Sequence, residues 1–477
     1  MNLPSSDPRR RWWALFVLCL GVLMIVLDTT IVNVALPSIR TDLGFSETSL
    51  VWVVNAYMLT FGGCLLLGGR LGDLYGHRRL FLAGLALFTV ASAACGLAQS
   101  QAMLVAARAV QGFGGAIVSA VSLSLIMNLF PEPEARAKAM GVYGFVCSAG
   151  GSIGVLLCGL LTTLSWHWIF LVNLPIGAVV VGLTLGLVPA SRGEAHQRLD
   201  VLGAITVTGS LMLAVYGVVG GNQAGWLSAQ TLVLLGAAVA LLALFIAIEA
   251  RVPAPLMPLS LFAIRNVATA NVAGVLWAAA MFAWFFISAL YMQLVLGYSP
   301  MQVGLAFLPG NLIMAVFSLG LSARLVMRFG LRGPLAAGLV VASAGLALFA
   351  RAPVGGSFVL DVLPGMVLLG LGAGIAFNPM LLSAMSGVDG KDAGLASGVV
   401  NTSFMMGGAL GLAVLASLAA ARTEGLQAAG AEAAQALAGG YQLAFTIGAV
   451  FALLAAAIGA GLMKVPAPTG ARAASDA

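Results

Sequence analysis

One carboxylate lies deep inside an otherwise apolar stretch near the start of the chain. The stretch FVLCLGVLMIVLDTTIVNVALPSI covers residues 16–39, and Asp28 is its single acidic residue. A charge at bilayer depth costs at least about 2.5–3.5 kcal/mol, so Asp28 should pair, face water or take up a proton. A carboxyl group that is influenced both by burial and by a nearby cation can exchange a proton near neutral pH. The alternative is a structural carboxylate that hydrogen bonds hold between packed helices.

A permanent cation, Arg108, lies in a second apolar stretch and is the obvious partner for Asp28. Side chains three or four positions apart share one face of a helix. The polar or small face that contains the arginine consists of Arg108, Gln111, Gly115, Ser119 and Ser122. A guanidinium group does not deprotonate in proteins, so it can balance a carboxylate without joining proton transfer. A structural ion pair between helices is again the alternative.

The other reactive side chains form no catalytic or metal-binding pattern. The five cysteines lie in apolar runs without ligand spacing, and the three histidines are scattered singly. We find no nucleophile motif and no converging cluster of acids and bases. We therefore expect no enzymatic activity, no metal and no cofactor, with protons as the coupling ion.

Membrane helices must position these residues. Of the 477 residues, 61% are hydrophobic and only 8% are charged, against about 25% charged residues in soluble proteins. Apolar runs of roughly 20 residues recur along the chain. We predict an all-α polytopic membrane protein with fourteen spans, among them residues 137–163, 200–221, 227–249 and 302–327.

Loop charge predicts the orientation of these spans. With a cytoplasmic N-terminus, eighteen of the 22 Lys and Arg residues fall in cytoplasmic segments. The external loops then hold only Arg40, Arg351 and Arg422, in accord with the positive-inside rule. Both termini are therefore predicted to be cytoplasmic. The net charge of +6 reflects topology and does not indicate nucleic-acid binding.

An internal repeat divides the chain. GGRLGDLYGHRRLFLAGL at 68–85 is echoed by SARLVMRFGLRGPLAAGL at 322–339, with a constant offset of 254. QGFGGAI, from Gln111, similarly resembles LGLGAGI, from Leu369, at an offset of 258. The repeat predicts two six-helix bundles with two helices inserted between them. The predicted units are an N-terminal bundle at 1–190, two inserted transmembrane helices and a linker at 191–265, and a C-terminal bundle at 266–477.

Four motifs give the chain a family resemblance. They are LDTTIVNVALPSI, GGRLGDLYGHRR, ARAVQGFGGAI and SWHWIFLVNLPIG. With them the chain resembles the major facilitator superfamily, and within it the fourteen-span drug:proton antiporters, over nearly its whole length. The resemblance implies the major facilitator fold and proton coupling through Asp28 and Arg108. The chain departs from the family pattern at Leu74 and His167. In the antiporter motif of the fifth predicted span, residues 137–163, it departs at Val155 and Cys158.

The resemblance also implies a conformational latch after the second span. Asp73 matches the aspartate that helps to lock the two bundles together on the cytoplasmic side in outward-facing transporters. The positive N-terminal end of the helix near Ala393 is the expected partner. The remaining latch residues are Gly69, Arg70, Gly76, Arg78 and Arg79. For the arginines, a role in topology or in binding anionic lipid head groups is the alternative.

Polar and aromatic residues inside spans are candidates for a substrate cavity. One helical stripe of aromatic residues could stack on flat, apolar molecules, although it could equally face lipid or a neighbouring helix. Amide side chains inside spans need partners or water. The full candidate set is Asn33, Asn55, Tyr57, Gln111, Trp277, Trp284, Tyr291, Asn311, Asn378, Asn401 and Phe404.

These observations favour a secondary active transporter that exports amphipathic or cationic small molecules, such as drugs, antibiotics and dyes, in exchange for protons by alternating access. An exporter of a lipid or endogenous metabolite, or a proton-coupled importer, is the alternative. The expected partners are a lipophilic small-molecule substrate and membrane lipids, with the protein acting as a monomer. The expected location is the cytoplasmic membrane of a bacterium.

Overall fold

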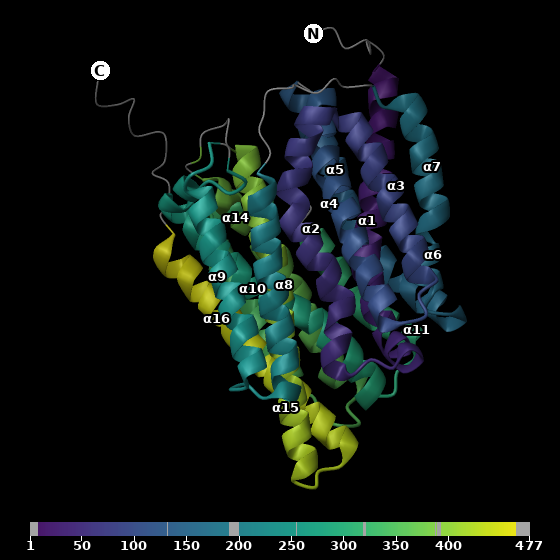
Figure 1. The fold of residues 1–477 in the computed structure, drawn as a ribbon, viewed down its shortest axis with the longest axis vertical. Helices are drawn as coiled ribbons and strands as arrows, with labels where there is room; N and C mark the ends of the chain where they lie inside the picture. Colours follow the sequence, from purple (N-terminus) through teal and green to yellow (C-terminus); the bar gives the residue numbers. More distant parts are fainter. Residues whose placement is uncertain are drawn as a thin grey trace.

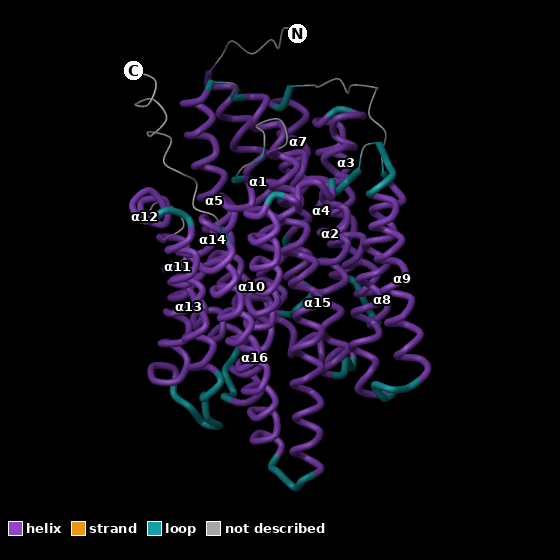
Figure 2. Tube along the Cα trace, turned by 90° about the vertical axis from the view of Figure 1, so that its left-hand side faces the viewer, coloured by secondary structure: helices purple, strands orange, loops and turns teal. Residues whose placement is uncertain are grey.

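The fold was obtained as a computed structural model, and it is helical throughout the part of the chain that it describes. The described residues are 8–130, 132–189, 200–253, 255–317, 321–386, 388 and 393–463. Long helices run roughly side by side (Figures 1 and 2). No strand occurs among these residues. The all-α expectation is therefore correct.

Seven helices form the N-terminal half. They are α1 (Pro8–Leu43), α2 (Glu47–Tyr75), α3 (His77–Gly96), α4 (Gln101–Leu129), α5 (Pro133–Leu164), α6 (Trp168–Leu171) and α7 (Asn173–Leu187). Local sequence sets several boundaries. Ser46 begins α2 with a capping box that it forms with Ser49, and the hydroxyl of Ser100 accepts from the backbone N–H of Met103 at the start of α4.

A helical hairpin and a linker separate the two halves. The hairpin consists of α8 (Val201–Ala224) and α9 (Ala229–Glu249), close to the predicted limits of 200–221 and 227–249. Asp200 caps α8 by accepting from the N–H of Gly203, and Ser228 caps α9. The linker then contains the short helix η1 (Leu259–Ala263).

The remaining helices form the C-terminal half. They are α10 (Arg265–Leu290), η2 (Tyr291–Val295), α11 (Pro300–Val316), α12 (Ser322–Phe329), α13 (Arg332–Phe349), η4 (Phe358–Val362), α14 (Leu363–Met385), α15 (Ala393–Ala428) and α16 (Ala433–Leu462). The predicted span 302–327 corresponds to α11 and α12, and residues 318–320 between them lie outside the described part. The beginning of α1 and the end of α16 lie at the same end of the molecule (Figure 1), here called the terminal end.

The two halves repeat one close helix contact. A Cβ on Gly114 would lie 2.8 Å from the backbone N of Phe88 and 2.9 Å from the carbonyl of Gly84, where α4 meets α3. A Cβ on Gly372 would lie 2.5 Å from the backbone N of Ala342 and 2.5 Å from the carbonyl of Gly338, where α14 meets α13. Offsets of 254 and 258 relate these pairs, so the sequence echo corresponds to a repeated contact.

The halves meet along α2 and α15, along α5 and α11, and where η2 contacts α1. The Nδ2 of Asn55 donates to the carbonyl of Ala409 at 2.9 Å, and the Nε2 of Gln293 donates to Val34 at 2.9 Å. Nearer the terminal end, a Cβ on Gly398 would contact the side chain of Leu66. The bundles are thus held together by helix packing and by amide hydrogen bonds to backbone carbonyls.

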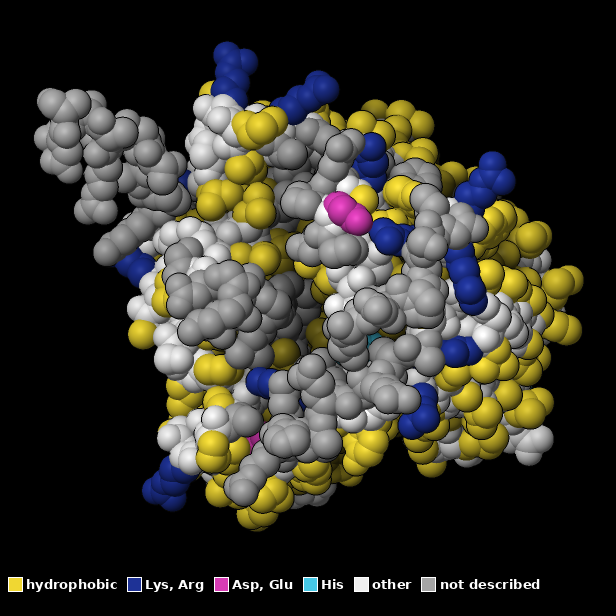
Figure 3. All heavy atoms as spheres, turned by 90° about the horizontal axis from the view of Figure 1, so that it is seen from above, with side chains coloured by type: hydrophobic (Ala, Val, Ile, Leu, Met, Phe, Trp, Pro, Cys, Tyr) yellow, Lys and Arg dark blue, Asp and Glu magenta, His cyan; other side chains and the backbone are white. Residues whose placement is uncertain are grey.

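Twelve helices in the described part of the chain are long and apolar enough to cross a membrane. The 32-residue α5 is not among these twelve, and α11 is a shorter apolar helix. The described structure therefore supports a multi-pass membrane protein with twelve candidate spans, fewer than the fourteen expected. Viewed from above in Figure 3, the described residues of the terminal end carry Lys and Arg side chains around its face, and few of the described side chains there are acidic.

Candidate functional site

Asp28 lies in a closed polar cluster inside the N-terminal half. Its side chain is fully buried, and its Oδ2 accepts a hydrogen bond from the Nη1 of Arg108 at 2.5 Å. Its Oδ1 accepts from the Nε2 of Gln111 at 2.7 Å and from the Nδ2 of Asn173 at 3.2 Å. Three N–H donors, one of them charged, therefore surround this carboxylate.

Arg108 is held in a fixed position by several different contacts. Its Nε donates to the carbonyl of Val53 at 2.9 Å, and its Nη1 also donates to the Oε1 of Gln111 at 2.6 Å. The guanidinium carbon lies 4.4 Å from the ring centre of Tyr57 and 5.7 Å from that of Phe170. The rings and the carbonyl compensate for lost water, so the buried cation is solvated by protein groups.

Ser92 connects the amide side chains of the cluster. Its hydroxyl oxygen accepts from Gln111 at 2.6 Å and from Asn173 at 3.0 Å. Sequence reasoning missed both Ser92 and Asn173. Asn173 is a polar residue within the apolar part of SWHWIFLVNLPIG, and this position was the available signal.

Four helices bring these groups to one point. Asp28 comes from α1, Ser92 from α3, Arg108 and Gln111 from α4, and Asn173 from the first turn of α7. The cluster residues are at most 1% exposed. In this conformation the carboxylate is buried, and protein donors take the place of water around it. The geometry suits a site that holds a charge until a conformational change opens it.

The aromatic stripe of α10 is packed against neighbouring segments. Trp277, Trp284 and Tyr291 are 1%, 4% and 2% exposed. The Trp284 ring lies 5.9 Å from that of Phe307 on α11, and the hydroxyl of Tyr291 donates to the carbonyl of Pro353. These three residues are therefore packed inside the protein in this conformation.

Phe404 lies in a different aromatic group at the junction of the two halves. Its ring centre is 5.9 Å from that of Phe282 on α10 and 6.5 Å from that of Phe377 on α14. A Cβ on Gly408 would lie within 3 Å of both Phe282 and the side chain of Met58 on α2, which places this group beside the opposite bundle. Sequence reasoning missed Phe282 and Phe377. We call Phe282, Phe377 and Phe404 the interface aromatic cluster.

The remaining cavity candidates fall in three environments. Tyr57 and Gln111 belong to the Asp28 cluster. Asn55 and Asn311 are buried, and the half-buried Asn33 donates weakly to Thr29 on its own helix at 3.4 Å. Asn378 is half-buried, and Asn401 is exposed on α15 three residues before Phe404. The last two lie on the helices that carry the interface aromatic cluster.

The latch residues lie at the terminal end of α2 and the beginning of α3. Gly76 joins the two helices with φ of +90°, a conformation that favours glycine. Arg78 donates to the carbonyl of Leu185 in the last turn of α7 at 2.5 Å, while Arg79 is exposed. Gly69 and Arg70 precede them on α2.

The predicted partner contact of Asp73 is not described. The side chain of Asp73 lies outside the described residues, as do the side chains of Val155 and Cys158 and the segment 389–392. The latch therefore stays a prediction. At the same end of the molecule, Arg11 forms a 3.3 Å ion pair with Glu132, joining the beginnings of α1 and α5. Hydrogen bonding by its own backbone N–H, and then Arg11, lower the pKa of the Glu132 carboxyl.

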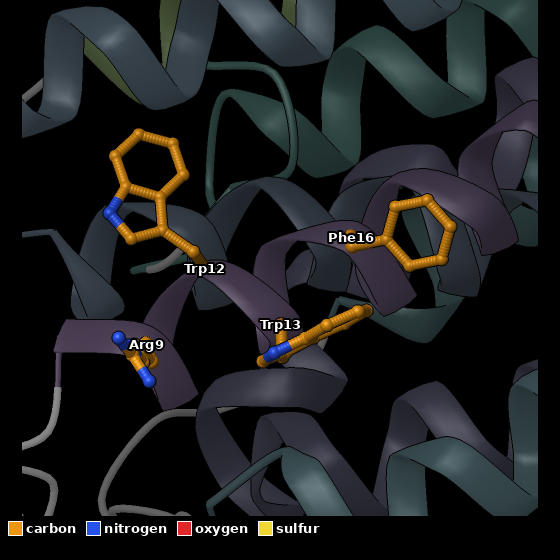
Figure 4. A pocket seen from close by; sticks show the side chains of 4 residues that line it. All are labelled: Arg9, Trp12, Trp13 and Phe16. Atoms are coloured by element: carbon orange, nitrogen blue, oxygen red, sulfur yellow. The ribbon is translucent and has the colours of Figure 1, made fainter.

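A shallow depression lies at the beginning of α1, away from the charged cluster. Its volume is about 390 Å³, and its lining residues are Arg9, Trp12, Trp13 and Phe16 (Figure 4). Trp13 and Phe16 are 58% and 53% exposed. Exposed aromatic rings at the end of a membrane helix are typical of the level of the lipid head groups. We therefore interpret this depression as a contact with the membrane.

Comparison with known proteins shows the family to which the chain belongs. The family model described as "Major Facilitator Superfamily" matches residues 18–412. The chain is 41% identical over 418 residues to a cephamycin export protein of Amycolatopsis lactamdurans, covering 86% of each chain. It is 40% identical over 423 residues to a puromycin resistance protein of Streptomyces alboniger, covering 88% of this chain and 84% of that one.

Solved structures show a similar arrangement of helices. A bacterial homologue of the human lysosomal transporter Spinster, solved in an inward-facing and unoccupied conformation, aligns with a TM-score of 0.66. The alignment covers 95% of this chain and 97% of that one, at 17% sequence identity. At this identity the likeness concerns the fold alone.

Proposed function

The chain belongs to the major facilitator superfamily, and from this premise we propose that it exports amphipathic or cationic small molecules in exchange for protons. It is a multi-pass membrane transporter, not an enzyme. Its relatives include proteins for cephamycin export and puromycin resistance, which supports drug export as the coarse function. The single observation that carries proton coupling is the buried pair of Asp28 and Arg108.

The pair couples proton binding to conformation through its burial. If Asp28 took up a proton in the closed cluster, Arg108 would become a buried cation without a counter-ion. Removing one partner of a buried pair costs about 3–5 kcal/mol, so the cluster must rearrange when the proton arrives. A rearrangement of α1 and α4 at their contact is a direct route from protonation to alternating access.

A substrate would bind where the two halves meet. The interface aromatic cluster offers flat apolar surface, and Asn378 and Asn401 offer polar groups on the same helices. A lipophilic cation gains from aromatic faces through cation–π contact. When such a cation approaches Asp28, it competes with the proton for the one negative charge, and this competition is the exchange step.

The direct test compares proton-driven efflux of the wild type with that of Asp28→Asn in proteoliposomes. We expect Asp28→Asn to lose uphill dye export, and Asp28→Glu to retain part of it. Asp42→Asn is the matched control. Asp42 lies in the last turn of the same helix, where its Oδ2 accepts a hydrogen bond from the Nε1 of Trp166. Size-exclusion chromatography checks that each variant is folded. Full uphill export by Asp28→Asn would place the proton site elsewhere.

We further propose that fourteen helices cross the membrane, arranged as two six-helix bundles around the α8–α9 hairpin. The two spans beyond the twelve candidates are α5, which has 32 residues, and α11, which continues towards α12. The basic terminal end would then face the cytoplasm of a bacterium, with both termini inside. Protons are the coupling ion, no other cofactor is needed, and the protein works as a monomer among lipids.

A further inference from the structure

Two carboxylates meet at the terminal end of the α8–α9 hairpin, far along the chain from Asp28. Asp200 stands at the N-cap of α8, and Glu249 is the last residue of α9. Their residues are only 5% and 4% exposed. Charged residues at helix ends usually reach water, so two acids that are both buried at one place require an explanation.

The two carboxyl groups face the same small space. The Oδ2 of Asp200 and the Oε1 of Glu249 lie 2.5 and 2.8 Å from the point where a Cβ on Gly203 would be. Neither oxygen has a hydrogen-bond partner among the described residues, and both are fully enclosed. The lack of a side chain at Gly203 therefore allows the two oxygens to approach each other.

The other oxygen of each carboxyl group holds the backbone. The Oδ1 of Asp200 accepts from the N–H of Gly203 at 2.7 Å, which caps α8. The Oε2 of Glu249 accepts from the N–H of Met257 at 3.0 Å, which fastens the α9–α10 linker. The adjacent Leu256 packs in one cluster with Leu67 of α2. The linker that Glu249 fastens thus contacts α2, a helix at the junction of the two halves.

We propose that Asp200 and Glu249 share one proton and form a second titratable site that fastens the linker to the hairpin. A proton on either acid gives an O–H donor that reaches the other carboxylate, so both enclosed oxygens are satisfied by one hydrogen bond. Two ionised carboxylates in contact would repel each other without water to screen them. The site titrates as a unit, and the proton belongs to the pair.

Among the described residues, no Lys, Arg or His side chain forms an ion pair with either carboxyl group. Asp200 is the titratable group that faces Glu249 from α8, and the linker presents the backbone N–H groups of Leu256 and Met257. Arg251 lies two residues beyond Glu249 and is exposed. When alkaline pH removes the shared proton, repulsion should push the carboxylates apart and loosen the hydrogen bond to Met257.

Infrared difference spectra of the full-length protein in lipid nanodiscs test the shared proton. We expect a protonated-carboxyl C=O band at neutral pH that disappears at alkaline pH. The band should be absent in Glu249→Gln and in Asp200→Asn, and should remain in Asp28→Asn and in the exposed control Glu424→Gln. A wild-type spectrum without the band at neutral pH, or a band that both pair variants retain, would overturn the proposal.

Stability against pH gives an independent measurement. Between the ordinary pKa of a carboxyl group, about 4.3, and neutral pH, the folded pair holds a proton that the unfolded carboxylates do not, so unfolding releases a proton and stability falls as pH rises through this range. The unfolding equilibrium constant should rise by up to about tenfold per pH unit for one proton. Glu249→Gln keeps an oxygen for Met257 and donates an N–H to Asp200, so it should fold and lose this slope. An unchanged slope in that variant would contradict the shared proton.

Discussion

At the scale of single residues, the cluster around Asp28 explains how a charge is stored without water. Each carboxylate oxygen has a protein donor, and Arg108 is neutralised by Asp28 while Val53 and the ring of Tyr57 replace its hydration. Electrostatic interactions are stronger in such a medium of low dielectric constant, so the removal of one donor has large consequences. Asn173 is the most informative residue to change, because it touches Asp28 from a helix that carries no charge.

We expect Asn173→Ala to destabilise the protein and to slow proton-coupled export. The variant removes one donor from Asp28 and one from Ser92 and leaves a small cavity, which together should cost about 1–3 kcal/mol. Thermal unfolding of the purified protein and dye efflux from proteoliposomes measure the two effects. Thr41→Ala is the control, since Thr41 is exposed and bonds within its own helix. Equal losses in both variants would show that Asn173 has no special relation to Asp28.

The sequence predicted the proximity of Asp28 and Arg108 but not the rest of the cluster. Two opposite charges in apolar helices have few ways to avoid each other, so their pairing follows from charge alone. Ser92 and Asn173 are uncharged, and their contribution depends on how α3 and α7 pack around α1. Asp200 and Glu249 were missed for another reason: charges at the ends of spans are read as topology, and burial at a helix end leaves no mark in the sequence.

At the scale of helices, glycines decide which pairs approach most closely. Gly114 and Gly372 make the same contact in the two halves, each against the backbone of the preceding long helix. The aromatic stripe shows the limit of periodicity: the spacing of Trp277, Trp284 and Tyr291 indicates a common face, but it does not reveal which segments cover that face. Phe282 and Phe377 were missed because they come together only through contacts between α10, α14 and α15.

We expect Gly114→Ala and Gly372→Ala to destabilise the protein to a similar extent. The added methyl group would overlap the backbone of Phe88 or Ala342, and such overpacking costs about 1–3 kcal/mol. Gly236→Ala is the control, because nothing lies within 4 Å of a Cβ at that position on α9. The melting temperature of each purified variant measures the effect. If Gly114→Ala melted at the control temperature, the repeated contact would not contribute to stability.

At the scale of the whole molecule, the number of spans fixes which loops share a side of the membrane. If fourteen helices cross, the α8–α9 turn near Gly225 lies outside and the α7–α8 and α9–α10 connections lie inside. We expect a cysteine placed at Leu227, which is 88% exposed, to react with an impermeant maleimide from outside intact cells. A cysteine at the exposed Arg251 should react only after the cells are opened. If position 227 reacted only in opened cells and position 251 reacted in intact cells, an odd number of spans would precede the hairpin.

The distribution of acids over the molecule also limits the charge of the substrate. Asp28 is the acid that the described structure places deep within the N-terminal half. In the C-terminal half, the Oδ2 of Asp361 accepts from the backbone N–H of Ser357 and caps the beginning of η4 at the end opposite the terminal end. Asp200 and Glu249 are engaged with each other and with the linker. We therefore expect a substrate at the junction of the two halves to meet one negative charge, that of Asp28, once the closed cluster around it opens.

We accordingly expect export of monovalent lipophilic cations or neutral compounds in preference to divalent cations. A monocation can replace the proton on Asp28 one for one, whereas a dication would leave one positive charge uncompensated in a medium of low dielectric constant, beside the fixed charge of Arg108. Efflux of matched mono- and dicationic quaternary ammonium compounds at several external pH values measures the preference. Asp361→Asn is the control and should leave both rates unchanged. If the dication were exported as fast and with the same pH dependence, a second acid would have to enter the cavity, and Asp361 would be the first residue to test.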